Sequence, residues 1–261
     1  MPDPRTRRQE LVAFFHEIAD CQKCRLAQDR TQVVFGSGDP DADLMFVGEA
    51  PGFHEDRQGK PFVGHAGKLL DDLLAGIGLN RKLCFIANVL KCRPPGNRDP
   101  QPDEVDACRA HLFRQIELIE PRVICTLGNF ATKLLSGRPD GITKVRGVPQ
   151  LHELGGRNVF LYPIFHPAAA LRTPAMLERL REDFQRLPEL LGQPVPQATD
   201  AERPVPPPVP EPTPPPIPEP NPPPVPEPTP PPMPEPYPPP PELVGAAAGS
   251  RRSAREQLGL F

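Results

Sequence analysis

Residues 44–52 combine a short apolar run with an abrupt turn, and this stretch constrains the fold more than any other. Residues 44–47 are Leu, Met, Phe and Val without a polar interruption, which is typical of a strand buried on both faces of a parallel sheet. Glycine and proline end the strand within residues 48–52. Glu49 is therefore expected at the edge where open α/β sheets bind ligands. An ordinary strand-to-helix turn would give the same pattern, so Glu49 needs support from the rest of the chain.

The chain around this strand alternates strands with helices. We expect further strands at residues 84–89, 123–127 and 159–165, and helices at about 7–19, 66–77 and 103–119. Such alternation predicts a parallel sheet covered by helices on both faces. A capping box at residues 6–9 is expected to start the first helix, and residues 53–65 are predicted to be a long functional loop. Glu49, Asn88 and His166 would then lie at the ends of three strands, on one edge of the sheet.

The six cysteines fall into two groups. Cys84 and Cys125 lie in predicted buried strands, where a thiol is most simply part of the core. The other four form two pairs in predicted loops or helix starts: Cys21 with Cys24, and Cys92 with Cys108. Four thiolates suit a [4Fe-4S] cluster or a tetrahedral zinc ion, and the spacing alone does not choose between them or exclude unrelated thiols. A closed four-thiolate site would have a structural role, ordering the basic loop at residues 93–98.

Proline divides the chain into unequal parts. Of the 43 prolines, 28 lie in residues 188–242, where an eight-residue unit repeats four times across residues 206–237. Proline at this density excludes helix and sheet and favours an extended polyproline conformation. We therefore expect a folded domain at 1–192, a disordered linker at 193–250 and a C-terminal peptide at 251–261. A stiff spacer is preferred over a ligand for a proline-recognition domain.

Charge and hydropathy exclude several broad classes of protein. Residues 1–191 contain 26 Lys and Arg against 25 Asp and Glu, so contact with a nucleic acid would need a local basic patch. The chain has no apolar run of 18 residues and no signal-peptide pattern at its start. We expect a cytoplasmic protein without a membrane partner.

Four motifs in this order resemble the family 4 (iron-sulfur) uracil-DNA glycosylases. They are Gly-Glu-Ala-Pro-Gly at 48–52, Pro-Phe-Val-Gly at 61–64, Asn88 four residues before Cys92, and His-Pro-Ala-Ala-Ala-Leu at 166–171. With the cysteine pairs, the match covers roughly residues 8–190. The resemblance implies an αβα sandwich with a four-stranded, mainly parallel sheet. It also implies a [4Fe-4S] cluster held by Cys21, Cys24, Cys92 and Cys108.

The resemblance further implies a monomer that removes uracil from single- and double-stranded DNA and leaves an abasic site. Breaking the N-glycosidic bond builds positive charge on the sugar and negative charge on the uracil, so a donor and an anion are needed. His166 would donate to uracil O2, and Glu49 would orient water or stabilise the sugar cation. Asn88 would donate to O4 and accept from N3–H, a pattern that cytosine reverses.

The remaining motif residues are expected to bind the base and the DNA. Phe62 would stack on the flipped base, Glu55 would close the pocket near C5, and Ala50 would line it. The residues expected to contact DNA are Arg93, Arg98, Arg146, Leu171 and Arg172. Singly, Phe62, Asn88 and His166 could each be ordinary buried residues, and only their joint occurrence favours the functional interpretation.

Two related functions stay open as alternatives. One is covalent trapping of uracil-DNA, which depends on a basic insertion with a histidine; residues 135–148 contain no histidine. The other is a noncatalytic iron-sulfur DNA-binding module attached to the replication machinery. The intact set of Glu49, Asn88 and His166 argues against this second alternative.

The last five residues resemble the Gln-Leu-x-Leu-Phe peptide by which bacterial repair proteins bind the DNA sliding clamp. The matching residues are Gln257, Leu258, Leu260 and Phe261, with glycine at the variable position. A short docking motif suits the end of an extended tether. We therefore expect the sliding clamp as a partner and a location near the bacterial nucleoid.

Overall fold

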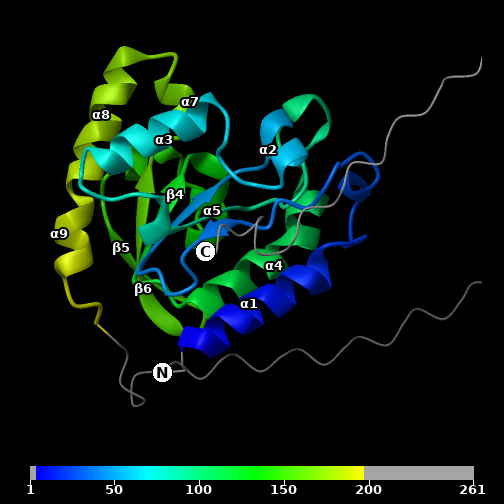
Figure 1. The fold of residues 1–261 in the computed structure, drawn as a ribbon. Coiled ribbons are helices and arrows are strands. Elements are labelled where there is room, and N and C mark those ends of the chain that lie inside the picture. The colour runs from blue at the N-terminus through cyan, green and yellow to red at the C-terminus, as the bar shows by residue number, and fades with distance from the viewer. Residues whose placement is uncertain (1–3, 197–261) are drawn as a thin grey trace, which may run out of the picture. The chain divides into compact units, whose positions relative to one another are not determined.

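The computed structural model describes residues 4–196, so the proline repeats and the C-terminal peptide lie outside the described residues. The centre of this part is a mixed sheet with helices around it (Figure 1). The sheet has six strands in the order β1-β3-β2-β4-β6-β5. The strands are β1 (Ser37–Gly38), β2 (Leu44–Gly48), β3 (Phe85–Asn88), β4 (Val123–Leu127), β5 (Gln150–Leu154) and β6 (Arg157–Ile164). Strands β3, β2, β4 and β6 are parallel neighbours, whereas β1 and β5 pair antiparallel at the two edges.

The expected four-stranded sheet is therefore wrong in strand number, although its four parallel strands form the centre. Strand β1 has only two residues, too few for a periodic pattern to be recognised. Strand β5 joins β6 through Gly155 and Gly156, which both have positive φ angles of 63° and 76°. Two glycines between two strand-like segments are a hairpin signal, because this turn needs positive φ at both positions.

Helices cover both faces of the sheet, as the alternating pattern predicted. They are α1 (Pro4–Ile18), α2 (Phe53–Gln58), α3 (His65–Ala75), α4 (Pro102–Ile119), α5 (Asn129–Ser136), α6 (Ile142–Val145), α7 (Pro167–Ala170), α8 (Pro174–Gln185) and α9 (Leu187–Gly192). Three short 3-10 helices are η1 (Arg25–Ala27), η2 (Arg81–Leu83) and η3 (Pro95–Asn97). Helices α1 and α4 lie on one face, and α3 and α8 lie on the other (Figure 1).

Strand β2 explains why the sheet needs both layers. Met45 and Val47 pack into the core under α1 and α4, while Leu44 and Phe46 pack into the core under α3 and α8. All five residues of β2 are buried. Alternate side chains of a strand point to opposite faces, so an uninterrupted apolar run needs cover on both sides.

Two local expectations were wrong. Helix α1 begins at Pro4, so the residues expected as a capping box lie inside the helix. The segment at 53–65, expected to be a loop, begins with the short helix α2. A true capping box starts α4 instead, where the carboxylate of Glu104 accepts a hydrogen bond from the Gln101 N–H at 2.9 Å. None of the helices in residues 4–196 is long and apolar enough to span a bilayer.

Candidate active site

The carboxyl ends of the parallel strands form one edge, and the predicted base-binding residues gather there. Gly48 at the end of β2 is aligned with Asn88 at the end of β3, and His166 follows β6 by two residues. A cavity of about 180 Å³ opens at this edge, lined by Ala50, Gly52, Glu55, Phe62, Ala66, Asn88 and His166. Glu49 is half-buried and precedes the lining residue Ala50, but it is not itself among the lining residues.

Asn88 presents an unused acceptor in this cavity. Its side chain is 2% exposed, and its Oδ1 atom has no hydrogen-bond partner within the described part of the chain. A buried polar atom left unpaired costs about 1–3 kcal/mol, so an unpaired oxygen that faces a cavity is a candidate ligand-binding atom. A Cβ atom at Gly48 would lie 2.4 Å from this oxygen, which explains why the strand ends in glycine.

Phe62 forms one wall of the cavity. Its ring lies 5.6 Å from the His166 ring, with the two planes 30° apart. A Cβ atom at Gly48 would come within 2.7 Å of the Phe62 ring, so the same glycine admits both the ring and the Asn88 amide. Phe62 has a φ angle of 52°, in the left-handed region that a bulky residue rarely adopts.

Glu55 organises the turn that follows Phe62. One of its carboxylate oxygens, Oε1, accepts hydrogen bonds from the N–H groups of Val63 at 2.9 Å and Gly64 at 3.0 Å. Glu55 lies in the first turn of α2 and also lines the cavity. The predicted base-binding residues Ala50, Glu55, Phe62 and Asn88 are therefore brought together around one space.

His166 is held as a neutral ring by its position before α7. Its Nδ1 atom accepts a hydrogen bond from the Ala168 N–H at 3.1 Å, and burial lowers the pKa of the ring to about 4. A neutral imidazole that accepts at Nδ1 carries its proton on Nε2. The structure thus leaves Nε2–H as a hydrogen-bond donor, without a formal positive charge on the ring.

Glu49 has a strongly perturbed carboxyl group. Burial, and to a smaller extent the negative charge of Asp99, raises the pKa of Glu49 to about 7. Glu49 is a strand-end carboxylate next to a cavity, and a shift of this size is frequent at functional sites. Near neutral pH the group can exchange between its charged and neutral forms.

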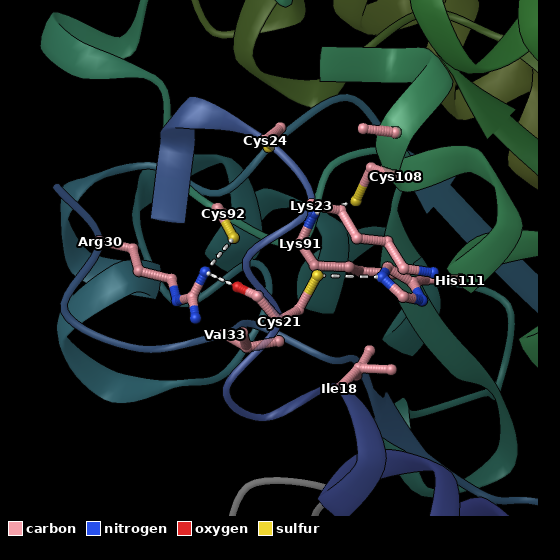
Figure 2. A pocket seen from close by; sticks show the side chains of 11 residues that line it. Ile18, Cys21, Lys23, Cys24, Arg30, Val33, Lys91, Cys92, Cys108 and His111 are labelled. Carbon is pink, nitrogen blue, oxygen red and sulfur yellow. Dashed lines mark hydrogen bonds between the residues drawn. The ribbon is translucent and has the colours of Figure 1, made fainter. Parts of the chain in front are cut away.

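The four paired cysteines line a second, smaller cavity between the N-terminal loop and α4 (Figure 2). Three nitrogen atoms contact their sulfur atoms. Arg30 Nη1 donates to Cys92 at 3.6 Å and the Lys91 backbone N–H donates to Cys108 at 3.3 Å, while His111 Nε2 lies 3.4 Å from Cys21. Within residues 4–196, no group of three or more His, Cys, Asp or Glu residues is arranged to hold a single metal ion.

The donor set nevertheless fits a four-thiolate cluster. Hydrogen bonds to the sulfurs and nearby charges are features that orient the ligands of such clusters and tune their properties. Burial raises the pKa of the Cys92 thiol to about 12 and that of Cys108 above its usual value, so bound metal would be needed to hold these groups as thiolates. Cys84 and Cys125 are fully buried in the core beside α3 and α8, as predicted.

The residues predicted to contact DNA have unequal freedom to do so. Leu171 is 51% exposed and Arg172 is exposed, both just after α7. Arg93 lies over the ring of Phe53, which is 45% exposed, at 5.2 Å. In contrast, two predicted arginines are engaged in ion pairs with buried carboxylates. Arg98 pairs with Glu104 through both terminal nitrogens, and Arg146 pairs with Asp183 at 2.9 Å.

Sequence reasoning missed two residues near the cavity. Phe53, with Arg57 and Arg93 over its ring, follows the cavity residue Gly52, and its position at the start of α2 was hidden by the expected loop. Arg81 contacts the Phe62 turn from a segment 19 residues away in sequence. An isolated arginine before a strand carries no periodic or motif signal that would reveal such a contact.

Comparison with known proteins gives a consistent result. Residues 35–188 match the family model described as the uracil DNA glycosylase superfamily. A type-4 uracil-DNA glycosylase of Sulfurisphaera tokodaii is 48% identical over 179 residues, covering 67% of this chain and 81% of that protein. The type-4 enzyme of Archaeoglobus fulgidus is 46% identical over 196 residues, covering 74% of this chain and 98% of its own length. The type-4 enzyme of Thermotoga maritima is 47% identical over 167 residues, covering 63% of this chain and 85% of that protein.

Proposed function

The chain belongs to the type-4 branch of the uracil-DNA glycosylase superfamily, and we propose that it removes uracil from DNA through Glu49, Asn88 and His166. The enzyme would be a hydrolase that acts on N-glycosyl bonds. Its product would be an abasic site, which starts base excision repair. The observation that carries this proposal is the unpartnered Oδ1 atom of Asn88 in a cavity walled by Phe62 and His166.

Base selection rests on Asn88. Its free Oδ1 atom can accept the N3–H proton of uracil, while its amide nitrogen can donate to O4. Cytosine presents an acceptor at N3 and a donor at N4, so both contacts would be mispaired. Phe62 would stack on the extruded base, Glu55 would close the pocket near C5, and Ala50 would line it.

Bond cleavage needs the departing uracil to accept negative charge at O2. His166 suits this task because its Nε2–H donor is fixed by the hydrogen bond from Ala168 to Nδ1. Burial keeps the pKa of the ring near 4, so the donor is a neutral imidazole throughout the neutral pH range. A preorganised donor stabilises the developing anion without reorganisation in the transition state.

Glu49 would serve the sugar side of the reaction. In its ionised form it can orient a water molecule toward C1′ or stabilise the positive charge that develops on the sugar. Because its pKa is about 7, the active ionised form becomes more populated as the pH rises through neutrality. The developing sugar cation would favour the same form.

Cys21, Cys24, Cys92 and Cys108 would hold a [4Fe-4S] cluster, supported by the N–H donors of Arg30 and Lys91 beside the sulfurs of Cys92 and Cys108. With four thiolates the cluster has no open coordination site, so it would supply structural order rather than chemistry. It would fix the loop from Cys92 to Arg98 against α4. The basic residues of this loop could then meet the DNA backbone.

DNA contacts are proposed at the predicted residues that no carboxylate pairs with in the described part of the chain, although Arg93 donates to Asn97 Oδ1 at 2.6 Å through Nε. Leu171 would fill the space vacated by the extruded base, and Arg172 and Arg93 would meet phosphate groups. Contacts from Arg98 and Arg146 would have to compete with Glu104 and Asp183. Both single- and double-stranded DNA would be substrates of the monomeric enzyme.

The C-terminal peptide is proposed to bind the DNA sliding clamp through Gln257, Leu258, Leu260 and Phe261, which lie outside the described residues. Residues 193–250, of which 197–250 lie outside the described residues, would act as a tether that holds the domain of residues 1–192 near the nucleoid. The test is a titration of the clamp with the full chain and with a chain ending at Glu256. Equal binding by the two proteins would eliminate this contact.

The activity is tested with a labelled oligonucleotide that contains one uracil, in the absence of added metal or nucleotide. We expect an abasic site, revealed by alkaline cleavage, and no product from a matched oligonucleotide with thymine. Binding without cleavage would favour the noncatalytic alternative, and an alkali-stable adduct would favour covalent trapping.

A further inference from the structure

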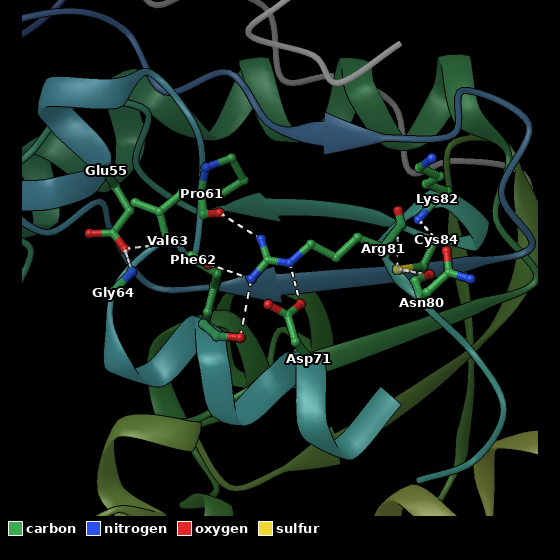
Figure 3. A network of polar contacts seen from close by, with 11 residues as sticks. Glu55, Pro61, Phe62, Val63, Gly64, Asp71, Asn80, Arg81, Lys82 and Cys84 are labelled. Atoms are coloured by element: carbon green, nitrogen blue, oxygen red, sulfur yellow. Dashed lines mark hydrogen bonds and ion pairs between the residues drawn. The ribbon is translucent and has the colours of Figure 1, made fainter. Parts of the chain in front are cut away.

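One arginine holds the turn that carries Phe62. Arg81 begins the 3-10 helix η2, and its guanidinium reaches the Pro61-Phe62 turn and α3 (Figure 3). Its Nη1 atom donates to the Pro61 carbonyl at 3.1 Å, and its Nη2 atom donates to the carbonyls of Gly67, at 3.1 Å, and Phe62. Its Nε atom pairs with Asp71. One side chain thus binds three carbonyl groups and a carboxylate.

The Phe62 turn needs such support because its backbone is strained. Phe62 has a φ angle of 52°, a conformation that persists only where the surrounding structure enforces it. The Phe62 carbonyl is also pressed against α3, since a Cβ atom at Gly67 would lie 1.8 Å from its oxygen. Without Arg81, the carbonyls of Pro61 and Phe62 would lose these hydrogen bonds, and the turn could relax.

The position of the Phe62 ring depends on this backbone. The ring fits between Gly48 and His166, where it is 6% exposed, so a rotation of its peptide would move the ring within a tightly filled space. We infer that Arg81 is a positioning residue, which fixes the Phe62 backbone so that the ring can stack on the extruded base. This inference rests on the stacking role proposed for Phe62.

The chemistry of arginine suits this task. A guanidinium presents several N–H donors in a rigid plane, whereas a lysine ammonium is a compact point charge on a flexible chain. Lysine at position 81 would keep the charge but contact fewer of the three carbonyls. Asp71 is 49% exposed, so its ion pair orients the arginine but is expected to matter less than the carbonyl contacts.

The experiment compares Arg81→Gln and Arg81→Lys with the matched control Arg157→Gln in the full chain. The Arg157 side chain is 31% exposed, close to the 28% of the Arg81 side chain. Arg157 pairs with Glu120 at 3.0 Å, and it lies at the start of β6, whereas His166 follows the end of this strand.

Misplacing a group by about 1 Å can cost about 100-fold in rate, so we expect Arg81→Gln to lower kcat by roughly 10- to 100-fold. Inhibition by free uracil should weaken, whereas affinity for abasic-site duplex should change less than about twofold. Arg81→Lys should be intermediate, and Arg157→Gln should match the original protein.

A double-mutant cycle with Phe62→Leu decides whether Arg81 acts through Phe62. If it does, Arg81→Gln should add little to the loss caused by Phe62→Leu alone, because the two changes remove the same interaction. Fully additive losses would overturn the inference, as would unchanged uracil inhibition in Arg81→Gln. If Arg81→Gln does not fold, Arg81→Lys carries the same cycle. Unchanged activity in Phe62→Leu would instead contradict the stacking role in the proposed function.

Discussion

The rings of Phe62 and His166 lie 5.6 Å apart with their planes 30° from parallel. One residue comes from the turn after α2 and the other from the end of β6, so two distant segments meet at one cavity. The stacking surface and the hydrogen-bond donor are therefore positioned against each other by direct packing. Changes that move one ring should disturb the other.

The pH dependence of excision should follow Glu49. Its pKa is about 7 because burial, and secondarily Asp99, opposes its ionisation. The ionised form is the one assigned to catalysis, so kcat/KM should rise with pH. The midpoint of this rise should lie at a pH of about 7. Asp99→Asn removes one negative neighbour and should move the midpoint to lower pH. If the original protein and Asp99→Asn had the same midpoint, Glu49 would not be the group that controls the pH dependence.

The same carboxyl group should make stability depend on pH. Its folded-state pKa of about 7 is above the ordinary value of 4.5, so the folded state retains a proton that the unfolded state releases between these values. The free energy of unfolding should therefore fall as the pH rises through this window. Glu49→Gln removes the ionisable group, so the stability of this variant should lack the fall caused by Glu49. The Tm of Glu49→Gln should therefore exceed that of the original protein by more at pH about 8 than at pH about 5. A gain independent of pH would contradict the burial of Glu49.

Asn88→Ala should reduce discrimination between uracil and cytosine more than it reduces DNA binding. The lost pairing is worth about 1–3 kcal/mol per group, which corresponds to roughly 5- to 150-fold in the ratio of kcat/KM values. The measurement compares oligonucleotides with uracil and with cytosine under single-turnover conditions. Asn80, which caps η2 through its side chain, provides a control amide, and Asn80→Ala should leave the ratio unchanged. An unchanged ratio in Asn88→Ala would remove Asn88 from base selection.

Purified protein should be brown, with broad absorbance near 400 nm and about four irons per chain, as a [4Fe-4S] site implies. Cys108→Ser should lose iron and weaken DNA binding, because the loop after Cys92 would no longer be fixed. Cys125→Ala should keep its iron, since Cys125 is buried in the core beside α3 and α8. Colourless protein with one zinc per chain would contradict the cluster, and iron loss in Cys125→Ala would contradict the ligand set.

Much of the fold followed from sequence because its central strands are short, apolar and uninterrupted. Strand β4 spans Val123–Leu127 as expected, and β2 extends one residue beyond the expected strand. The edge strands were missed for a physical reason. Strand β1 is held by pairing with β3, and β5 alternates half-buried and exposed residues over most of its length. Such strands depend on tertiary contacts more than on local apolar pattern.

The candidate site was predictable only where a motif marks a residue. Asn88, Phe62 and His166 belong to motifs, and the structure brings them to one cavity. Arg81 has no motif, and its contact with Phe62 exists only once α3 and β3 have packed. The pairing of Arg146 with the buried Asp183 could not be predicted from the sequence either. A basic residue in a sequence does not reveal whether its partner is DNA or a buried carboxylate.

His166 is proposed to donate to the departing uracil, and single-turnover excision by His166→Ala measures what this donor contributes. Removing a donor of this kind costs about 100- to 1000-fold in rate, and binding of uracil-containing DNA should be retained. His152→Ala is the matched control, since His152 is also half-buried and has a pKa lowered by burial, but lies on the edge strand β5. Excision should slow in His166→Ala and stay at the original rate in His152→Ala. Excision by His166→Ala at the original rate would contradict the role proposed for His166.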